Sequence, residues 1–245
     1  MIGTFLNIGS VLLGGLLGLL FGSRLPARLK ETVIAGLGLF TMVMGIQMFL
    51  KTGNPLIVLS ALLIGVLLGE WWKIEDGLQT LGRGLEERFA KNGEPGGLVS
   101  EASGTQPPKT SRFVRGFLTA SLLFCVGPLT ILGSIQDGLR GDYSLLAVKS
   151  VLDGFASLAF ASTLGIGVMF STLVILIYQG GISLLAAQLS AVVTEPMMNE
   201  MTAAGGVILI GLAISSLLEV KSIRVGNFLP ALAVAPLIVW ILTLL

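Results

Sequence analysis

Apolar runs long enough to cross a lipid bilayer recur along almost the whole chain. A transmembrane helix needs about 20 mostly apolar residues, and eight segments come close to that length: 2–22, 32–50, 55–70, 113–135, 145–163, 166–190, 202–218 and 227–245. Since lipid offers no hydrogen bonds to the backbone, such runs are stable there as helices. The pattern predicts an all-α polytopic membrane protein with about eight transmembrane helices.

Composition agrees with this class and argues against others. Of the 245 residues, 53% are hydrophobic and 12% are charged, whereas soluble domains carry about 25% charged residues. The basic residues are dispersed and the net charge is +1, which is no footprint for nucleic acid. The chain has no histidine and one cysteine, and it lacks zinc and nucleotide motifs. We expect no enzyme, no cofactor, and the lipid bilayer as the main partner.

Lysine and arginine gather in every second connection between the predicted spans. If the N-terminus is outside, three of the fifteen basic residues, Lys51, Arg140 and Lys149, fall on or toward the outside, and the rest face the cytoplasm. Positive charge in short loops is retained on the cytoplasmic side. The distribution therefore predicts both termini outside.

Residues 71–112 form the one sizeable segment between spans. Apolar residues recur there at spacings of three and four: Ile74, Leu78, Leu81, Leu85 and Phe89. This spacing predicts an amphipathic helix on the inner membrane face or on neighbouring helices. A stretch rich in Gly, Pro and Ser follows and is typical of a flexible linker.

The first and last parts of the chain share a pattern of glycines. The segment Gly9–Gly22 has the glycine spacing of Gly167–Gly180, and the Asn54-Pro55 turn corresponds to the region 227–230. We therefore predict two inverted three-helix repeats around a central helix pair, a plan common in secondary transporters. The domains would be 1–70 (repeat 1), 71–112 (cytoplasmic helix and linker), 113–163 (central pair with a broken helix) and 164–245 (repeat 2).

A charged pair interrupts the fifth apolar run near its middle. Lys149 and Asp153 are spaced to pair at i, i+4 on a helix, and Ser157 continues the same face. A charge inside a span costs about 2.5–3.5 kcal/mol on insertion scales. One interpretation is a self-neutralising pair that holds the helix in place. The other makes Asp153 a coupling carboxylate with Lys149 as its counter-charge.

The fourth run carries a Gly127-Pro128 break. Proline removes a backbone bond and disrupts the preceding turn, so the break could present backbone groups to an ion or could be a packing kink. Polar residues follow toward the outer end of this run, where they line a pathway or form a surface turn. The candidate pathway residues are Asp153, Lys149, Gly127, Pro128, Thr130, Ser134, Gln136, Asp137, Ser157 and, in the sixth run, Gln179. The sequence around Gln179, with Tyr178 and Gly180, indicates a helix break or close packing.

Glycines at intervals of four form stripes in the first and third runs. Such small residues let helices approach closely, either within one chain or in a homodimer. The stripe residues are Gly14, Gly18 and Gly22 in the first run and Gly65 and Gly69 in the third.

The chain resembles the domain-of-unknown-function family 554 over nearly its whole length. The resemblance lies in segments 126–142, 149–168 and 225–232, together with 2–18 and 24–39. The resemblance implies a multi-pass protein of the bacterial inner membrane, in a family sometimes labelled as transporters. Residues 152–168 are also similar to the SxDAFAxS pattern of manganese exporters, although Leu152 replaces a small residue and no second such aspartate matches. A metal, if bound, would use Asp153.

These observations together favour a secondary transporter of a small ion or solute, with its site near the midplane around Asp153 and the Gly127-Pro128 break. An ion channel is one alternative. A structural or regulatory membrane protein that acts through residues 71–112 is another.

Overall fold

The computed structural model describes residues 1–22, 26–89 and 111–244, and within these ranges every regular element is helical. The predicted linker falls in 90–110, outside the described residues. In chain order the elements are α1 (Ile2–Gly22), α2 (Ala27–Phe49), α3 (Pro55–Trp72), α4 (Ile74–Phe89), α5 (Arg112–Cys125), α6 (Pro128–Arg140), α7 (Ser144–Leu164), η1 (Ile166–Phe170), α8 (Ser171–Leu184), α9 (Ala186–Val192), α10 (Glu195–Leu212), η2 (Ala213–Leu217), η3 (Val225–Phe228) and α11 (Ala231–Leu244).

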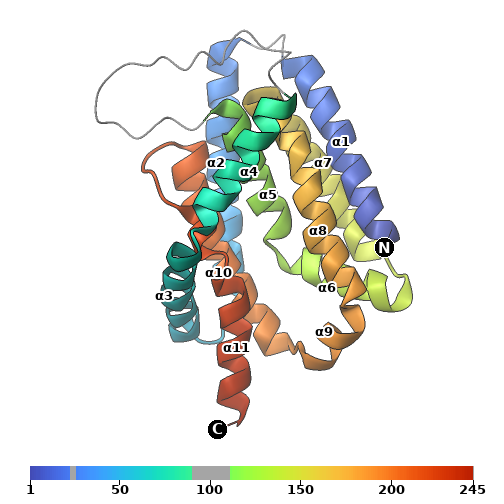
Figure 1. Cartoon of the computed structure of the whole chain (residues 1–245), viewed down its shortest axis with the longest axis vertical. Coiled ribbons are helices and arrows are strands. Elements are labelled where there is room, and N and C mark those ends of the chain that lie inside the picture. Colours follow the sequence, from blue (N-terminus) through green and yellow to red (C-terminus); the bar gives the residue numbers. More distant parts are fainter. Residues whose placement is uncertain (23–25, 90–110, 245) are drawn as a thin grey trace.

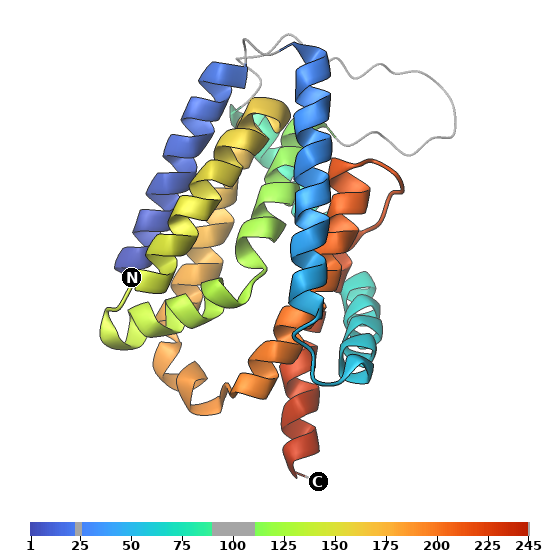
Figure 2. The ribbon, with the colours of Figure 1, turned by 180° about the vertical axis from the view of Figure 1, so that it is seen from behind.

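Seven helices in the described ranges are long and apolar enough to cross a membrane, and the bent pair α5–α6 makes eight if it counts as one span. These helices coincide with the eight apolar runs. The prediction of an all-α, multi-pass architecture is confirmed at this level. The chain ends of α1 and α11 both lie at the lower end of their helices in Figures 1 and 2.

Helix α5 occupies the centre of the molecule. The group formed by α1, α7 and α8 lies on one side of it, and the group formed by α2, α3, α10 and α11 lies on the other (Figures 1 and 2). Below the C-terminal end of α5 the chain turns by 63° into α6, which runs across the lower end of the first group (Figure 2).

The tightest helix contact joins α1 and α7, which run parallel. A Cβ on Gly14, Gly18 or Gly22 would collide with the backbone of Gly154, Leu158 and Ser162 respectively, so the two helices touch backbone to backbone. The Ser10 hydroxyl adds a 2.6 Å hydrogen bond to the Ser150 carbonyl in the same register. The first glycine stripe therefore packs within the chain, against the fifth predicted span.

The second glycine stripe packs against the last helix. Gly65 faces Ala231 and Gly69 faces the backbone of Asn227, so α3 and α11 are antiparallel. Both stripes are thus filled by partners in the same chain, and a homodimer would have to use other surfaces. Helices α2 and α10 cross in a similar way, where a Cβ on either Gly45 or Gly206 would meet the carbonyl of the other.

Helix α4 is the amphipathic helix that the apolar spacing predicts. Leu78 and Leu85 pack against Phe113, Val114 and Phe117 of α5. The Glu75 carboxylate accepts a 2.7 Å bond from the Gly226 amide, and the Glu75 amide donates to the Asn227 side chain at 2.8 Å. The chain itself therefore covers part of the apolar face of α4, while Leu81 and Phe89 are 50% and 57% exposed.

The sixth span differs from the sequence expectation at its end. Helix α8 continues without a break through Tyr178 and Gln179 to Leu184, and the separate helix α9 follows at Ala186. Gln179 and Gly180 are buried, so these residues serve close packing, and the alternative of a helix break at this point is wrong.

Candidate functional site

The charged pair predicted in the fifth span lies at the interface of α7 with α1 and α8. Lys149 and Asp153 form an ion pair one turn apart on α7. Their side chains are 7% and 12% exposed. Burial of both charges gives little stability by itself, since desolvation offsets the attraction.

Two amides from neighbouring helices complete the surroundings of this pair. The Asn7 side chain on α1 donates to Asp153 Oδ2 at 3.0 Å and to Gln179 Oε1 on α8 at 3.1 Å. Gln179 in turn donates to the Thr4 hydroxyl at 3.5 Å. Three helices thus meet through one buried polar network, and each of Thr4, Asn7 and Gln179 is at most 1% exposed.

A second buried carboxylate, Asp137, contacts α1 one helical turn before the position where Asp153 contacts it. Asp137 on α6 accepts a 3.1 Å hydrogen bond from the Gly3 amide and pairs with the Met1 amino group at 3.2 Å. Asp137 is 2% exposed, so its assignment to a polar surface turn is wrong. Gly3 and Asn7 are about 6 Å apart along the helix axis, which links the surroundings of Asp137 to those of Asp153.

Several buried polar atoms in this region lack partners. In the described part of the chain seven buried side-chain N or O atoms make no hydrogen bond. Four of them belong to Asn7, Asp137, Ser134 and Ser183. Ser134 lies one turn from Asp137 on α6, and Ser183 lies one turn from Gln179 on α8. Buried polar groups are normally satisfied, and such exceptions often mark sites for water or ions. We refer to Asp137, Ser134, Ser183, Thr4, Asn7, Gln179, Lys149 and Asp153 as the polar column.

The helix break at Gly127-Pro128 is confirmed, and its backbone is locally repaired. Gly127 has φ 152°, and α6 begins at Pro128. A proline at 128 leaves the Phe124 carbonyl without its helical donor. The Thr130 hydroxyl donates to this carbonyl at 3.2 Å. Thr130 therefore serves the break itself, and the carbonyl expected to be exposed is occupied.

Two other predicted pathway residues lie outside the network. Ser157 is fully buried but donates to the Val11 carbonyl at 2.8 Å, which binds α7 to α1. Gln136 is half-buried and makes no hydrogen bond within the described ranges. The structure brings five of the predicted pathway residues into one region of the fold: Asp153, Lys149, Asp137, Ser134 and Gln179.

A cavity of about 860 Å³ opens on the other side of α5. Its lining residues place it alongside α5, between α8–α9 and α10–α11. Its lining is mainly apolar, with Leu118, Leu229, Leu232 and Trp240 among its members. The pair Lys149–Asp153 does not line it, but Cys125 does.

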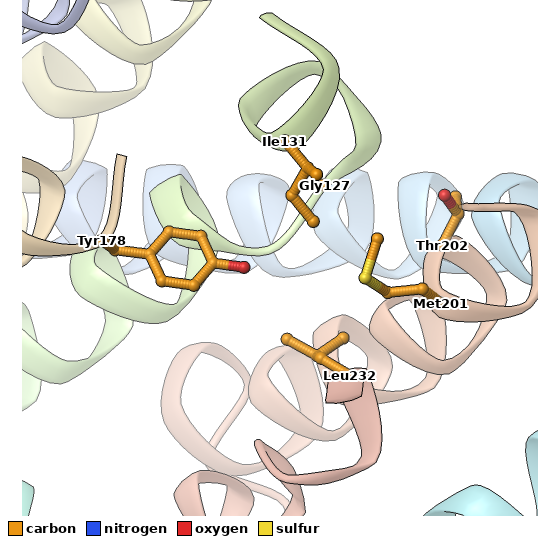
Figure 3. Close-up of a pocket in the computed structure, with 6 residues that line it drawn as sticks. All are labelled: Gly127, Ile131, Tyr178, Met201, Thr202 and Leu232. Carbon is orange, nitrogen blue, oxygen red and sulfur yellow. The ribbon is translucent and has the colours of Figure 1, made fainter. Parts of the chain in front are cut away.

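A narrow recess of this cavity reaches the helix break. The recess is lined by Gly127, Ile131, Tyr178, Met201, Thr202 and Leu232. Figure 3 shows the Tyr178 hydroxyl pointing toward Gly127, with the Met201 side chain reaching into the same space. The hydroxyl has no hydrogen-bond partner in the part of the chain that the structure describes.

Sequence reasoning missed Asn7 and Thr4 as members of the site. Both were visible as polar residues in the first apolar run, but their partners lie more than 140 positions away. A helix period places Gly3 and Asn7 on one face, yet nothing local indicates which helix that face meets. Among the described residues no three His, Cys, Asp or Glu side chains group together as they would in a typical metal site.

The helices and their apolar surfaces define a multi-pass membrane protein. The family described as "Protein of unknown function (DUF554)" matches residues 2–240, and the chain belongs to this family. It is similar to "Uncharacterized protein YqgA" of Escherichia coli (strain K12), with 32% identity over 234 residues that cover 96% of this chain and 94% of the relative. It is also similar to "Uncharacterized membrane protein YdfK" of Bacillus subtilis (strain 168), with 29% identity over 246 residues, 99% of this chain and 97% of the relative. No solved structure matches.

Proposed function

We propose that this protein is a secondary transporter that moves a small ion or solute across the bacterial inner membrane, with Asp153 as its coupling carboxylate. The observation that carries the proposal is the polar column, in which a buried ion pair inside a span adjoins four polar atoms without partners. Charged groups inside lipid are costly, so spans that serve only helix packing would be expected to carry apolar residues at these positions.

The coupling step follows from the charges of the column. A small cation or a proton that reaches Asp153 neutralises its carboxylate and weakens the pair with Lys149. The freed ammonium then has to find another partner, and this need links cation binding to a change of helix packing. Asn7 holds the carboxylate in place from α1 during this exchange.

The route to Asp153 runs along α1 from Asp137. The unpartnered atoms on this route include the Oδ1 atoms of Asn7 and Asp137, which can only accept hydrogen bonds. Acceptors favour water or a cation over an anion. We therefore assign the coupling species to the cations, the proton included.

The helix break supports movement near this route. Helix α6 is attached to α5 through the two residues Val126 and Gly127 at a 63° bend, and non-helical backbone at membrane depth is tolerated where it faces protein or a water-filled cavity. Rotation at this joint would change the contacts of Asp137 and Ser134 without disturbing α5.

Contacts between equivalent helices support the inverted repeat. The second and third helices of the first repeat, α2 and α3, pack antiparallel against α10 and α11, the helices that would be their counterparts. Helices α2 and α10 cross at Gly45 and Gly206, five residues from the Gly45–Gly211 correspondence of the proposed repeat. With the basic residues on alternate loops, this arrangement has both termini outside.

A solid-supported-membrane measurement tests the proposal. Proteoliposomes of the purified protein are exposed in turn to jumps of pH, Na⁺, K⁺ and organic anions, and charge movement is recorded. We expect saturable transient currents that Asp153→Asn abolishes and that Glu195→Gln, an exposed carboxylate on α10, leaves intact. Flux that does not saturate would instead indicate a channel. Full activity of Asp153→Asn would rule out its coupling role.

A further inference from the structure

We propose that the cavity of about 860 Å³ between α8–α9 and α10–α11 is a binding site for a single-chain amphipathic anion, with the apolar body in the cavity and the anionic head at the Gly127 break. The binding does not depend on the proposed function. The further step, that this amphiphile is the transported solute, rests on that function.

The size and lining of the cavity fit an apolar ligand body. Small-molecule sites typically measure about 300–1,000 Å³ and combine apolar walls with a few placed polar groups. Here Leu229, Leu232, Leu237 and Trp240 form one wall. The cavity lies at membrane depth, since these residues belong to the last span, and an amphiphile dissolved in the bilayer can reach it.

A few polar groups line this cavity and the recess that adjoins it. Ser121 lines it, is 3% exposed, and has no partner for its hydroxyl. Cys125 lies one turn further along the same face of α5. The unpartnered Tyr178 hydroxyl points toward Gly127 in the adjoining recess (Figure 3). A hydroxyl that is left unpaired away from water is destabilising. A groove filled only by lipid chains would leave these hydroxyls unpaired, whereas a ligand with a polar head would pair with them.

The helix terminus at the recess favours a negative head group. Helix α6 has 13 residues and starts at the break, and its N-cap, Gly127, provides no side-chain cap. Pro128 has no N–H and the Thr130 amide donates to the Gly127 carbonyl at 3.2 Å, so the Leu129 amide and the helix dipole are what attract an anion here. The Tyr178 hydroxyl adds a donor in the recess at Gly127, and the Ser121 hydroxyl adds one in the adjoining cavity. An alkyl carboxylate matches this combination of one donor-rich end and one apolar body.

Fluorescence of Trp240 provides the test. The chain has three tryptophans, and Trp71 and Trp72 are exposed at 78% and 62%, so Trp71→Phe with Trp72→Phe leaves Trp240 as a single reporter on the cavity wall. The protein is placed in nanodiscs of phosphatidylcholine and phosphatidylglycerol and titrated with brominated decanoate. We expect saturable quenching that plain decanoate reverses and decyltrimethylammonium does not.

Matched variants separate binding from partition into lipid. A Leu67→Trp reporter in a variant without the other tryptophans, at a position 71% exposed on α3, should show non-saturable quenching. Ala233→Phe places a ring inside the cavity and should weaken the saturable part. Ser121→Ala keeps the apolar walls and should weaken binding about 10-fold, the effect of one lost hydrogen bond.

Four outcomes would overturn the proposal. They are quenching of Trp240 that never saturates, saturable quenching unchanged by Ala233→Phe, equal competition by the cationic amphiphile, and saturable quenching by brominated phospholipid alone. The last would identify the cavity as a lipid site. Saturable decanoate binding without decanoate-dependent currents would leave the binding site established and exclude this amphiphile as the solute.

Discussion

The amide of Asn7 joins two spans by donating to Asp153 at 3.0 Å and to Gln179 at 3.1 Å. This contact connects the charged pair of α7 to α1 and α8. Because Asn7 Oδ1 has no partner, the same residue also offers an acceptor beside the carboxylate. The link is therefore both a structural bond and a candidate ligand position.

Removing one member of the charged pair should destabilise the fold. Lys149→Met leaves an uncompensated carboxylate inside the bundle, which costs about 3–5 kcal/mol. The double variant Lys149→Met with Asp153→Leu should recover most of this stability but no transport. Thermal unfolding and flux measured on the same preparations check both statements. A double variant that transports normally would contradict the coupling role, and a stable Lys149→Met variant would contradict the burial of the pair.

Replacing Asn7 should weaken the three-helix contact. Asn7→Leu removes both donated bonds and leaves the Gln179 carbonyl oxygen buried without a donor, with an expected loss of about 1–3 kcal/mol. Gln47→Leu on α2 is a suitable control, since Gln47 is exposed and should tolerate leucine. The midpoint of thermal unfolding is the measurement. Equal effects of the two substitutions would show that the network adds no stability.

The close contact of α1 with α7 predicts opposite effects for two glycines of one helix. Gly14→Ala places a methyl group against the Gly154 carbonyl, and overpacking of this kind costs about 1–3 kcal/mol. Gly9→Ala meets no atom within 4 Å and should stabilise the helix by about 0.5–1 kcal/mol. Comparing their melting temperatures checks the register. A tolerated Gly14→Ala would mean that the helices lie further apart.

The loop between α2 and α3 is held by a buried carboxylate of α10. Glu200 accepts from the Thr52 hydroxyl at 2.6 Å and from the amides of Gly53 and Asn54 at 2.8 and 3.1 Å. Glu200→Ala should cost about 1.5–3 kcal/mol, the range for hydrogen bonds to a charged group. Glu195→Gln should be neutral. Thermal unfolding distinguishes them, and a neutral Glu200→Ala would show that the loop needs no anchor.

Cysteine labelling in intact cells tests the predicted orientation. In a Cys125→Ala background, Lys51→Cys should react with a membrane-impermeant maleimide, because its loop is expected outside. Lys221→Cys should react only after the cells are opened. Both positions are exposed. The reverse pattern would place both termini in the cytoplasm.

Local patterns were sufficient for the helices. Hydrophobic length located the spans, the three-and-four spacing from Ile74 to Phe89 located α4, and the Gly127-Pro128 pair located the break. The i, i+4 spacing of Lys149 and Asp153 also predicted their pairing. These features depend on neighbours within one or two helical turns, so the sequence contains the information directly.

Contacts between helices could not be read in the same way. The glycine stripe of α1 indicated close packing but not that α7 is its partner, and Asp137 resembled a surface residue because Arg140 and Asp142 follow it. Burial of Asp137 depends on the start of α1, which is distant in sequence. Likewise the repair of the break by Thr130 required the observed turn geometry.

The backbone contact between α1 and α7 also limits how the protein can work. Helices that touch through glycine faces over their length cannot slide or roll past one another without steric clash, so they behave as one rigid strut. Asp153 and Asn7 are both part of that strut and remain stationary during any cycle. For the transport proposed above, the moving parts would then be the pieces that surround this strut, chiefly α6 on its two-residue joint and the short α9, and they would expose a stationary carboxylate alternately to the two sides of the membrane.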